Sequence, residues 1–536
     1  MRNITLATAR RDTDFPRSFT FDEVSELNRD ASVALTTIRE WMNSLVPINR
    51  LPPRLDVLSL IPTHLFSQTD RFRTTFVCRH WRRTFLQNAA LWSNLCLSKG
   101  GVYVKTLLKR AKGTPLTILA SRMDSVSTVS LLPPHTKQIA SLEFANNHWA
   151  DIQRFSEINS GPLPPLRILN INIIWRGWGG SDMGASLSHT LFSEATGLKE
   201  FRLHSETSPF LSRFVFPNLT SFELSVILME EFRVSELLDF LEASPMLQVV
   251  HVEIVATLSL EGVSQERVVA LQHVGSLCLT VRDGGPSHKL ATHISCPSVK
   301  NTSLTYMHNR EHGNPVPLDV FPTSDSLNAI IRQYTTSPIE EVGFETITDP
   351  NPYAFSTRSL ILRSADTTII DFRFQIVEFE LGDSAKSLNF DVFSKACKTI
   401  RDLPLLANVK YLHIHGALDI ETESITRIAH EFGGLLKSLG PLEELTIHRC
   451  DMRPYFSYYP EIVEYPPIKV LTLSDAWKKL DEDAVKGLVR LTKTQHEIGV
   501  PFERVTIHSD ISPADIEEKL RPWVGTVDCP LYDGSQ

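Results

Sequence analysis

The sequence predicts an α/β fold, in which a small N-terminal helical module precedes a long domain of parallel strands alternating with helices. Residues 20 to 97 carry helical patterns of apolar residues. Beyond residue 100 a six-residue apolar template recurs, and segments with helical periodicity separate its copies. The predicted divisions are a flexible N-terminus (1–19), an amphipathic helix (20–46), a helical module (47–98), a repeat domain (99–515) and a C-terminal tail (516–536).

Two helical patterns define the N-terminal part. Apolar residues between 20 and 45 are spaced by three and four, as on one face of an amphipathic helix, and Thr20 with Glu23 forms a capping-box pattern at its start. Pro47 ends this helix. The next segment, 51–97, should contain a helix with a single apolar stripe. The members of that stripe are Phe72, Phe76, Val77, Trp81 and Phe85.

The template L-x-x-L-x-L, with substitutions, organises the rest of the chain. Copies begin at Ile139, Leu166, Leu198, Leu219, Leu247, Val274, Ile339, Ile376, Val409, Leu442, Ile468 and Phe502, with a weaker copy at Val299. Most lie about 21 to 40 residues apart. A short strand followed by a helix at this period predicts a leucine-rich-repeat-like solenoid, whose units stack and pair their strands in parallel. The stretches 283–322 and 349–355 are predicted as loops.

Composition narrows the classes of function. The formal net charge of -8 gives no reason to expect a nucleic-acid partner. The 7 cysteines include no CxxC pair, which suits reduced thiols, and the N-terminus lacks the apolar run of a signal peptide. No stretch approaches the roughly 18 to 20 apolar residues of a membrane-spanning helix. We therefore expect a soluble cytoplasmic or nuclear protein that binds neither membrane nor nucleic acid.

Motifs that would indicate catalysis are absent from the sequence. It holds no GxxxxGK[ST] loop, no HExxH helix and no GxSxG elbow, so we expect no catalytic residue, cofactor or metal. The glycine run 177–184 fits a loop better than a phosphate cradle. The basic residues between 71 and 83 could bind an anion, but the solvated face of an amphipathic helix is the favoured interpretation.

Four histidines fall at or just past the ends of predicted strands. His413, His415, His448 and His508 could line up on one surface of the repeat domain. A metal site would need three or four ligands converging at about 2 Å from the ion. No cysteine or carboxylate spacing supports such a site, so the pattern favours ordinary surface histidines.

The helical module carries a family resemblance. It starts with Leu51-Pro52, continues through the aliphatic positions Leu58, Ile61 and Leu65, and ends with Val77-Cys78-Arg79-x-Trp81 and Leu91-Trp92. This order and spacing resemble the Leu-Pro start, the VCxxW centre and the terminal Leu-Trp of the F-box family. One difference is that Arg54-Leu55 separates Leu-Pro from the acidic Asp56. The repeat region of this chain resembles the degenerate leucine-rich repeats that often follow an F-box.

The resemblance implies an adaptor without catalytic residues of its own. Its module would dock on a Skp-type linker subunit, which joins a cullin scaffold in an E3 ubiquitin ligase, and its repeats would hold an unknown protein substrate. The implied linker-binding residues are Leu51, Pro52, Leu58, Ile61, Leu65, Val77, Trp81, Leu91 and Trp92. Two alternatives stay open, namely a repeat-based scaffold without ligase association and a hydrolase or transferase within the repeats.

Overall fold

The computed structural model describes part of the chain. The described residues are 32–33, 35, 72–73, 75–76, 79–121, 126–159, 163–174, 192, 195–206, 211–227, 231–282, 287–310, 323–335, 337–348, 355–366, 368–378, 394–403, 407–415, 422–448, 466–474, 482–508 and 513–529. They fall into two compact units, the first containing Met1–Ser93 with Thr106–Thr114 and the second Asn94–Lys105 with Pro115–Gln536. Each unit is described by itself.

The first unit contains α4 (Arg79–Gln87) and the 3-10 helix η3 (Ala89–Trp92). Asn88 caps η3, since its side chain accepts a hydrogen bond from the amide of Ala90. The predicted single stripe from Phe72 to Phe85 is wrong, because residues 75 and 76 form a turn before α4 begins. The amide and hydroxyl of Thr75 both bond to the carbonyl of Phe72, which ends the preceding helical turn. The amphipathic helix predicted for 20–46 lies outside the described residues except for 32, 33 and 35, which are helical.

The second unit is built on a 17-stranded sheet, as far as the described residues show. Its strands, in the order in which they lie side by side, are β1 (Asn94–Cys96), β2 (Leu116–Ser121), β3 (Ile139–Asn147), β4 (Ile168–Ile173), β5 (Glu200–Ser205), β6 (Ser221–Ile227), β8 (Val249–Val255), β11 (Ser276–Arg282), β13 (Asn301–Arg310), β16 (Ile369–Glu378), β15 (Phe355–Ser364), β14 (Ile339–Thr348), β17 (Tyr411–His415), β18 (Leu442–His448), β19 (Ile468–Ser474), β20 (Arg504–Ile507) and β21 (Thr526–Asp528). All neighbours are parallel except β15, which is antiparallel to both β14 and β16.

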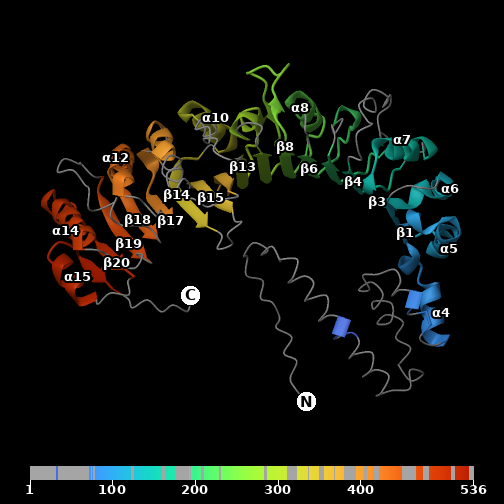
Figure 1. Cartoon of the computed structure of the whole chain (residues 1–536), viewed down its shortest axis with the longest axis horizontal. Coiled ribbons are helices and arrows are strands. Elements are labelled where there is room, and N and C mark those ends of the chain that lie inside the picture. Colours follow the sequence, from blue (N-terminus) through green and yellow to red (C-terminus); the bar gives the residue numbers. More distant parts are fainter. Residues whose placement is uncertain are drawn as a thin grey trace, which may run out of the picture. The chain divides into compact units, whose positions relative to one another are not determined.

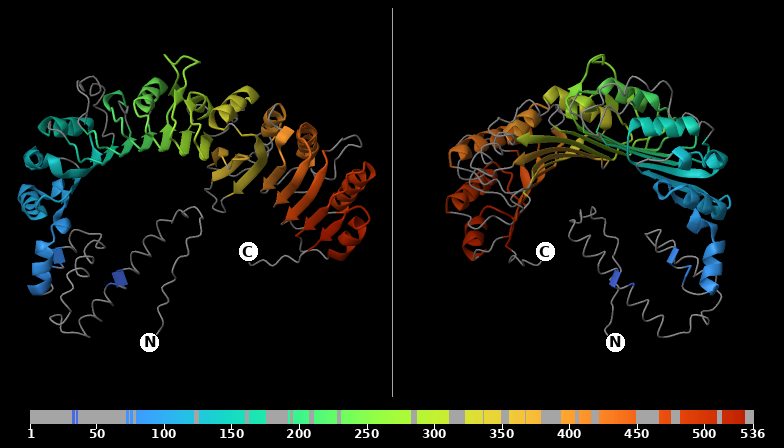
Figure 2. Two further views of the ribbon diagram at one scale, coloured as in Figure 1. Left: turned by 180° about the vertical axis from the view of Figure 1, so that it is seen from behind. Right: turned by 45° about the vertical axis from the view of Figure 1, so that its right-hand side comes forward.

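Helices connect the strands and gather on one side of the sheet (Figure 1). They are α5 (Gly101–Ala111), α6 (Val126–Val129), α7 (Trp149–Ile158), α8 (Val234–Glu242), α9 (Ser287–Ala291), α10 (Ser324–Tyr334), α12 (Thr422–Ser438), α14 (Glu482–Glu497) and α15 (Pro513–Leu520), with a further helical segment at 394–401. Figure 2 shows α7 to α15 on that side in two other views. Short 3-10 turns are η4 (Leu97–Lys99), η5 (Pro133–Gln138) and η7 (Leu211–Arg213), and the short strands β7 (Phe232–Arg233), β9 (Leu258–Ser259), β10 (Val269–Ala270) and β12 (Ile294–Ser295) form two small sheets.

The core lies between the sheet and these helices. Along most strands alternate residues are buried, as Leu169, Ile171 and Ile173 are in β4, while Asn170 and Asn172 between them are not. This alternation is what a sheet with one covered face requires. An aromatic cluster extends the pattern: Phe201 of β5 lies 4.9 to 5.9 Å, between ring centroids, from Phe214, Phe216, Phe222 and Phe240.

The predicted α/β class with a large, mostly parallel sheet is therefore confirmed. Strands occur at twelve of the thirteen predicted templates within about two residues of their start. At Ile376 the template falls on the end of β16, which begins at Ile369. The predicted loop 283–322 contains α9, β12 and the whole of β13, and β21 continues the sheet beyond residue 515, where the sequence predicts a tail.

One segment departs from the all-parallel stacking that the template predicts. After β13 the chain forms β14, β15 and β16 in succession, and β16 then returns to pair with β13, while β14 pairs with β17. The connection between β15 and β16 is a tight turn in which the Ser364 hydroxyl bonds to Asp366 and the Thr368 amide bonds back to Ser364. A turn this short permits only antiparallel pairing, because a parallel crossover needs about a dozen residues or more.

Candidate functional site

The face of the sheet opposite the helices carries the candidate site. Its side chains are those that alternate with the buried core positions, so their backbone is fixed by the same hydrogen bonds that build the sheet. Eight titratable side chains lie together on β14 to β18, in and beside the antiparallel segment. We call them the charged patch: Glu341, Glu345, Arg363, Asp371, Arg373, His413, His415 and His448.

A row of polar residues crosses three strands of the charged patch. The strand register pairs Glu345 with His415, and His415 with His448. The Nδ1 atom of His415 lies 3.3 Å from the Glu345 carboxylate, and the two imidazole rings are 4.5 Å apart between centroids. Ser474 of β19 continues the row, 2.5 Å from Nδ1 of His448. The row therefore begins with an anion and continues with two groups that can become cations.

A second group of ions surrounds Glu341, which precedes Glu345 by four residues on β14. The Arg363 guanidinium lies 2.5 Å from the Glu341 carboxylate, and Nε2 of His413 lies 3.8 Å from the same carboxylate. Gly343, between Glu341 and Glu345 in sequence, pairs with Ile361 and His413 and has no side chain on this face. Gly343 is buried, and a Cβ atom there would lie 3.5 Å from the Cβ atom of Ile361.

Asp371 differs from the other carboxylates in its burial. Only 8% of the residue is exposed, and its Oδ2 atom accepts a hydrogen bond of 2.6 Å from Arg373. Burial raises the pKa of Asp371 above its ordinary value, although the Arg373 charge opposes that shift. The hydrogen bond from His415 has the opposite effect on Glu345 and lowers its pKa, with Arg373 and Arg363 assisting. The pKa values of the two carboxylates are thus shifted in opposite directions.

Within the described ranges, no group of three or more His, Cys, Asp or Glu side chains could hold a metal ion. The sequence correctly places His413, His415 and His448 on one surface. His508 follows β20, and its amide donates to the carbonyl of Leu473, which places it beside the Ser474 end of the row.

Sequence analysis missed the acidic and arginine members of the charged patch. Glu341 and Glu345 alternate with the buried residues Val342 and Phe344, and this pattern could have marked one strand face. The antiparallel partner was not recognised, because the template contains no strand of that direction. Without β15 and β16, the arginines that balance these glutamates could not be placed.

Most of the predicted linker-binding residues lie outside the described part of the chain. These are Leu51, Pro52, Leu58, Ile61, Leu65 and Val77; Trp81 is in α4, but its side chain is not described. Leu91 and Trp92 are described and buried, with 4% and 2% of their surfaces exposed. The Trp92 ring packs 5.3 Å from Phe72, between centroids, and the Arg110 guanidinium lies 4.8 Å from its centre. Both residues therefore act as core within the first unit.

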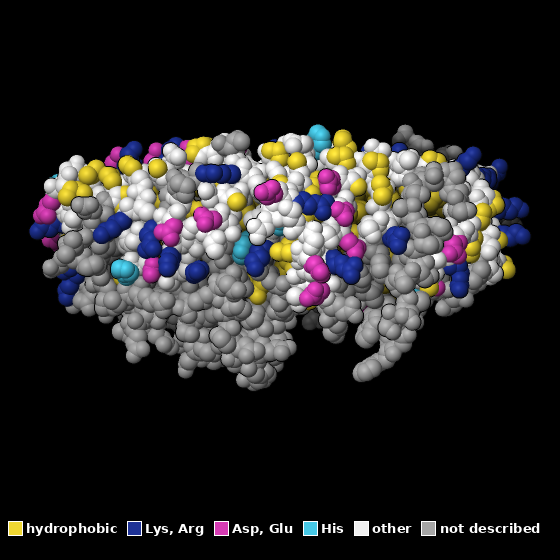
Figure 3. Space-filling view, turned by 90° about the horizontal axis from the view of Figure 1, so that it is seen from above, with side chains coloured by type: hydrophobic (Ala, Val, Ile, Leu, Met, Phe, Trp, Pro, Cys, Tyr) yellow, Lys and Arg dark blue, Asp and Glu magenta, His cyan; other side chains and the backbone are white. Residues whose placement is uncertain are grey.

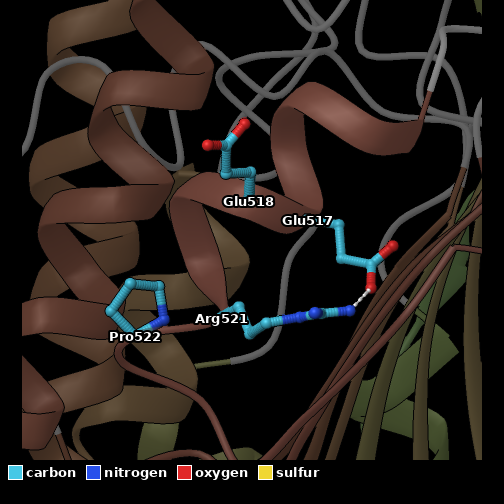
Figure 4. A pocket seen from close by; sticks show the side chains of 4 residues that line it. All are labelled: Glu517, Glu518, Arg521 and Pro522. Carbon is cyan, nitrogen blue, oxygen red and sulfur yellow. Dashed lines mark hydrogen bonds and ion pairs between the residues drawn. The ribbon is translucent and has the colours of Figure 1, made fainter.

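Two other parts of the surface also carry charged side chains. On the helix side of the sheet, basic, acidic and hydrophobic side chains are intermingled (Figure 3). A pocket of about 440 Å³ is lined by Glu517, Glu518, Arg521 and Pro522 at the end of α15. Figure 4 shows that the Arg521 side chain extends toward Glu517, with which it forms an ion pair. Because this pair is exposed, with 75% of the Arg521 side chain accessible, the pocket offers no convergent set of buried groups.

Comparison with known proteins assigns this chain to no family. No protein-family model matches the sequence, and no curated protein matches it. No described helix has the length and apolar character needed to cross a membrane. The class that the structure defines is an α/β protein with a large, mostly parallel sheet, helices on one face and the charged patch on the other.

Proposed function

We propose that the chain is a non-enzymatic substrate-binding adaptor of a Skp/cullin/F-box-type E3 ubiquitin ligase. In this proposal residues 47–98 dock on a Skp-type linker subunit, which joins a cullin scaffold, and the charged patch binds a protein substrate. The succession of Leu51-Pro52, Trp81 and Leu91-Trp92 along the chain supports the first part. Leu91 and Trp92 would contribute indirectly, by holding α4 in position from the core.

The charged patch is the observation that carries the second part. Its ions occur in pairs of opposite sign, namely Glu341 with Arg363, Asp371 with Arg373, and Glu345 with His415. Such a surface suits a protein segment with charges of both signs, because each incoming charge finds an opposite one at a fixed position. Side chains on neighbouring strands stand about 4.8 Å apart, so a bound segment that crosses the strands meets the charged pairs at regularly spaced positions.

Strands followed by helices at a recurring period support a leucine-rich-repeat-like solenoid for the second unit, with β14 to β16 as an insertion. A rigid frame of this kind would hold the side chains of the charged patch in fixed positions for the substrate. The adaptor would then act by proximity, raising the effective concentration of substrate lysines near the ubiquitin-conjugating enzyme. No reacting group of its own is needed for that task.

Two double variants separate the two parts of the proposal. Leu58→Asp with Trp81→Ala should abolish co-purification with a Skp-type linker and its cullin, yet leave substrate binding unchanged. Glu341→Lys with Glu345→Lys should do the reverse, because it places like charges beside Arg363 and His415. The matched control is Glu261→Lys with Glu266→Lys, the same charge change at two exposed loop positions, which should alter neither interaction.

The substrate is identified by combining binding with abundance. Proteins that bind the wild-type chain and accumulate in cells when the Leu58→Asp/Trp81→Ala variant replaces it are the expected substrates. Binding of those proteins should weaken at least tenfold in the charged-patch variant, corresponding to about 1.4 kcal/mol. If the well-folded wild-type chain associates with neither linker nor cullin, the ligase proposal fails and a repeat-based scaffold becomes the better account.

A further inference from the structure

Three neighbouring strands bring a carboxylate, an imidazole and a thiol into one row, away from the charged patch. The register pairs Glu223 of β6 with His251 of β8, and His251 with Cys278 of β11. All three alternate with buried core residues of their strands, so they lie on the helix-free face. Directly paired residues on adjacent parallel strands are separated by about 4.8 Å, which is within reach of side-chain contact.

The strand register places the imidazole of His251 beside the Cys278 thiol. Interaction with the Cys278 side chain raises the pKa of His251, although burial opposes the shift, and the nearby charges of Glu223 and Glu253 add to it. A more basic imidazole is a better acceptor for the thiol proton. The row therefore places a nucleophile, Cys278, beside a base, His251, and the base beside a carboxylate, Glu223, that can orient it.

The groups around His251 hold the two carboxylates in place. Arg202 of β5 lies 3.4 Å from the Glu223 carboxylate and also pairs with Glu200. The Ser225 hydroxyl donates to Glu253 across 3.3 Å. On the other side of the thiol, the register pairs Cys278 with the neutral Ser303 of β13. The imidazole is thus the titratable group directly beside the sulfur in this register.

The other described cysteines have different surroundings. Cys296 is buried, and burial raises its pKa to about 12. Burial also raises the pKa of Cys397 well above its ordinary value, and burial together with Glu517 and Asp528 raises that of Cys529. Cys96 contacts the Ser98 hydroxyl at 3.1 Å. Since the thiolate is the reactive form of cysteine, the raised pKa values of Cys296, Cys397 and Cys529 disfavour their reaction, whereas Cys278 is partly exposed and has His251 beside it.

We propose that Cys278 is a thiol modification site that reacts with hydroperoxides, with His251 as its base and Glu223 as the residue that positions the imidazole. His251 takes the thiol proton, and the sulfur attacks one peroxide oxygen. An S–O bond forms as the O–O bond breaks, and the sulfur loses two electrons to become a sulfenic acid. The leaving hydroxide takes the proton from the imidazolium and departs as water, which restores His251.

The test is peptide-resolved mass spectrometry of the full chain treated with hydrogen peroxide and a sulfenic-acid trap such as dimedone. Cys278 should be trapped at least tenfold faster than Cys296, Cys397 or Cys529. The rate should fall at least tenfold in His251→Gln, because a positioned base typically contributes about 10²-fold or more. Glu223→Gln should reduce it less. The matched control His273→Gln changes an exposed histidine just before β11 and should leave the rate unchanged.

Internal controls keep the result decisive. Continued protection of the buried Cys296 and Cys397 in each variant shows that the fold is intact. The pH profile of the wild-type rate provides a second readout, which should show a titration that is missing in His251→Gln. A Cys278 rate equal to that of the buried cysteines, or one unchanged by His251→Gln in an intact fold, would overturn the proposal.

Discussion

The indole Nε1 of Trp92 donates a hydrogen bond of 2.9 Å to the backbone carbonyl of Phe85. This bond ties η3 to the last turns of α4, at the end of the run that resembles an F-box. The same carbonyl also accepts a weaker bond, of 3.3 Å, from the amide of Asn88. The aromatic residue therefore anchors the helix from inside the first unit.

Replacing Trp92 should loosen this anchor in a graded way. Trp92→Phe removes the indole donor and should lower the free energy of unfolding of the first unit by about 1 to 2 kcal/mol. Trp92→Ala also creates a cavity and should lower it by about 3 to 5 kcal/mol. Denaturant unfolding followed by circular dichroism measures both. Phe76→Ala is the control, because 75% of Phe76 is exposed and its loss should change stability by less than about 0.5 kcal/mol.

Acid should destabilise the second unit through Glu345. The hydrogen bond from His415 holds the pKa of Glu345 below its ordinary 4.5, so its contribution to stability is complete above that pH. The contribution is lost as the pH falls through the lowered pKa. Glu345→Gln should remove this pH dependence. The variant should therefore show a smaller decline in melting temperature than the wild type as the pH falls from about 5 to about 3. An unchanged decline would show that the carboxylate has no folded-state partner.

Asp371 should act with the opposite sign. Burial raises its pKa above the ordinary 3.8, so its ionisation opposes folding, and stability falls as the pH rises through the raised pKa. Asp371→Asn removes that ionisation. As the pH rises from about 3.8, the free energy of unfolding of Asp371→Asn should therefore increase relative to that of the wild type. Parallel melting curves at several pH values measure this difference, and a constant offset would contradict the assignment.

Gly440 should not tolerate a side chain. It precedes β18, and a Cβ atom there would lie 2.8 Å from the backbone carbonyl oxygen of Ala407 in the preceding connection. Gly440→Ala should lower the free energy of unfolding by about 1 to 3 kcal/mol through overpacking. Gly275 precedes β11 in the same way, but a Cβ there would be 4.0 Å from the Gln248 carbonyl. Gly275→Ala is thus the matched control, and equal losses in both variants would exclude the steric explanation.

The sequence predicts the parallel part of the sheet well, because each strand there carries its own local signal. Ile171, Leu203 and Leu224 recur at the same template position, and each lies in the core. The antiparallel β15 is different, since its direction is set by a partner strand and by the turn at Ser364 to Thr368. The paired charges of the candidate site depend on that pairing, so the arginines and glutamates could not be brought together from spacing alone. The histidines could, because they occur on parallel strands.

The reversed segment also has a consequence for how the chain reaches its folded state. In a simple repeat array each unit contacts only its neighbours, so folding can start anywhere and spread along the chain. Here the pairing of Asn301 with Ile369 joins two strands that β14 and β15 separate in sequence. Closing this long loop costs conformational entropy, so we expect the pairing to form late. The strands from β1 to β13 and those from β14 onward can therefore begin to fold from separate nuclei. Cooperative unfolding of the whole sheet then depends on the pairing between β13 and β16.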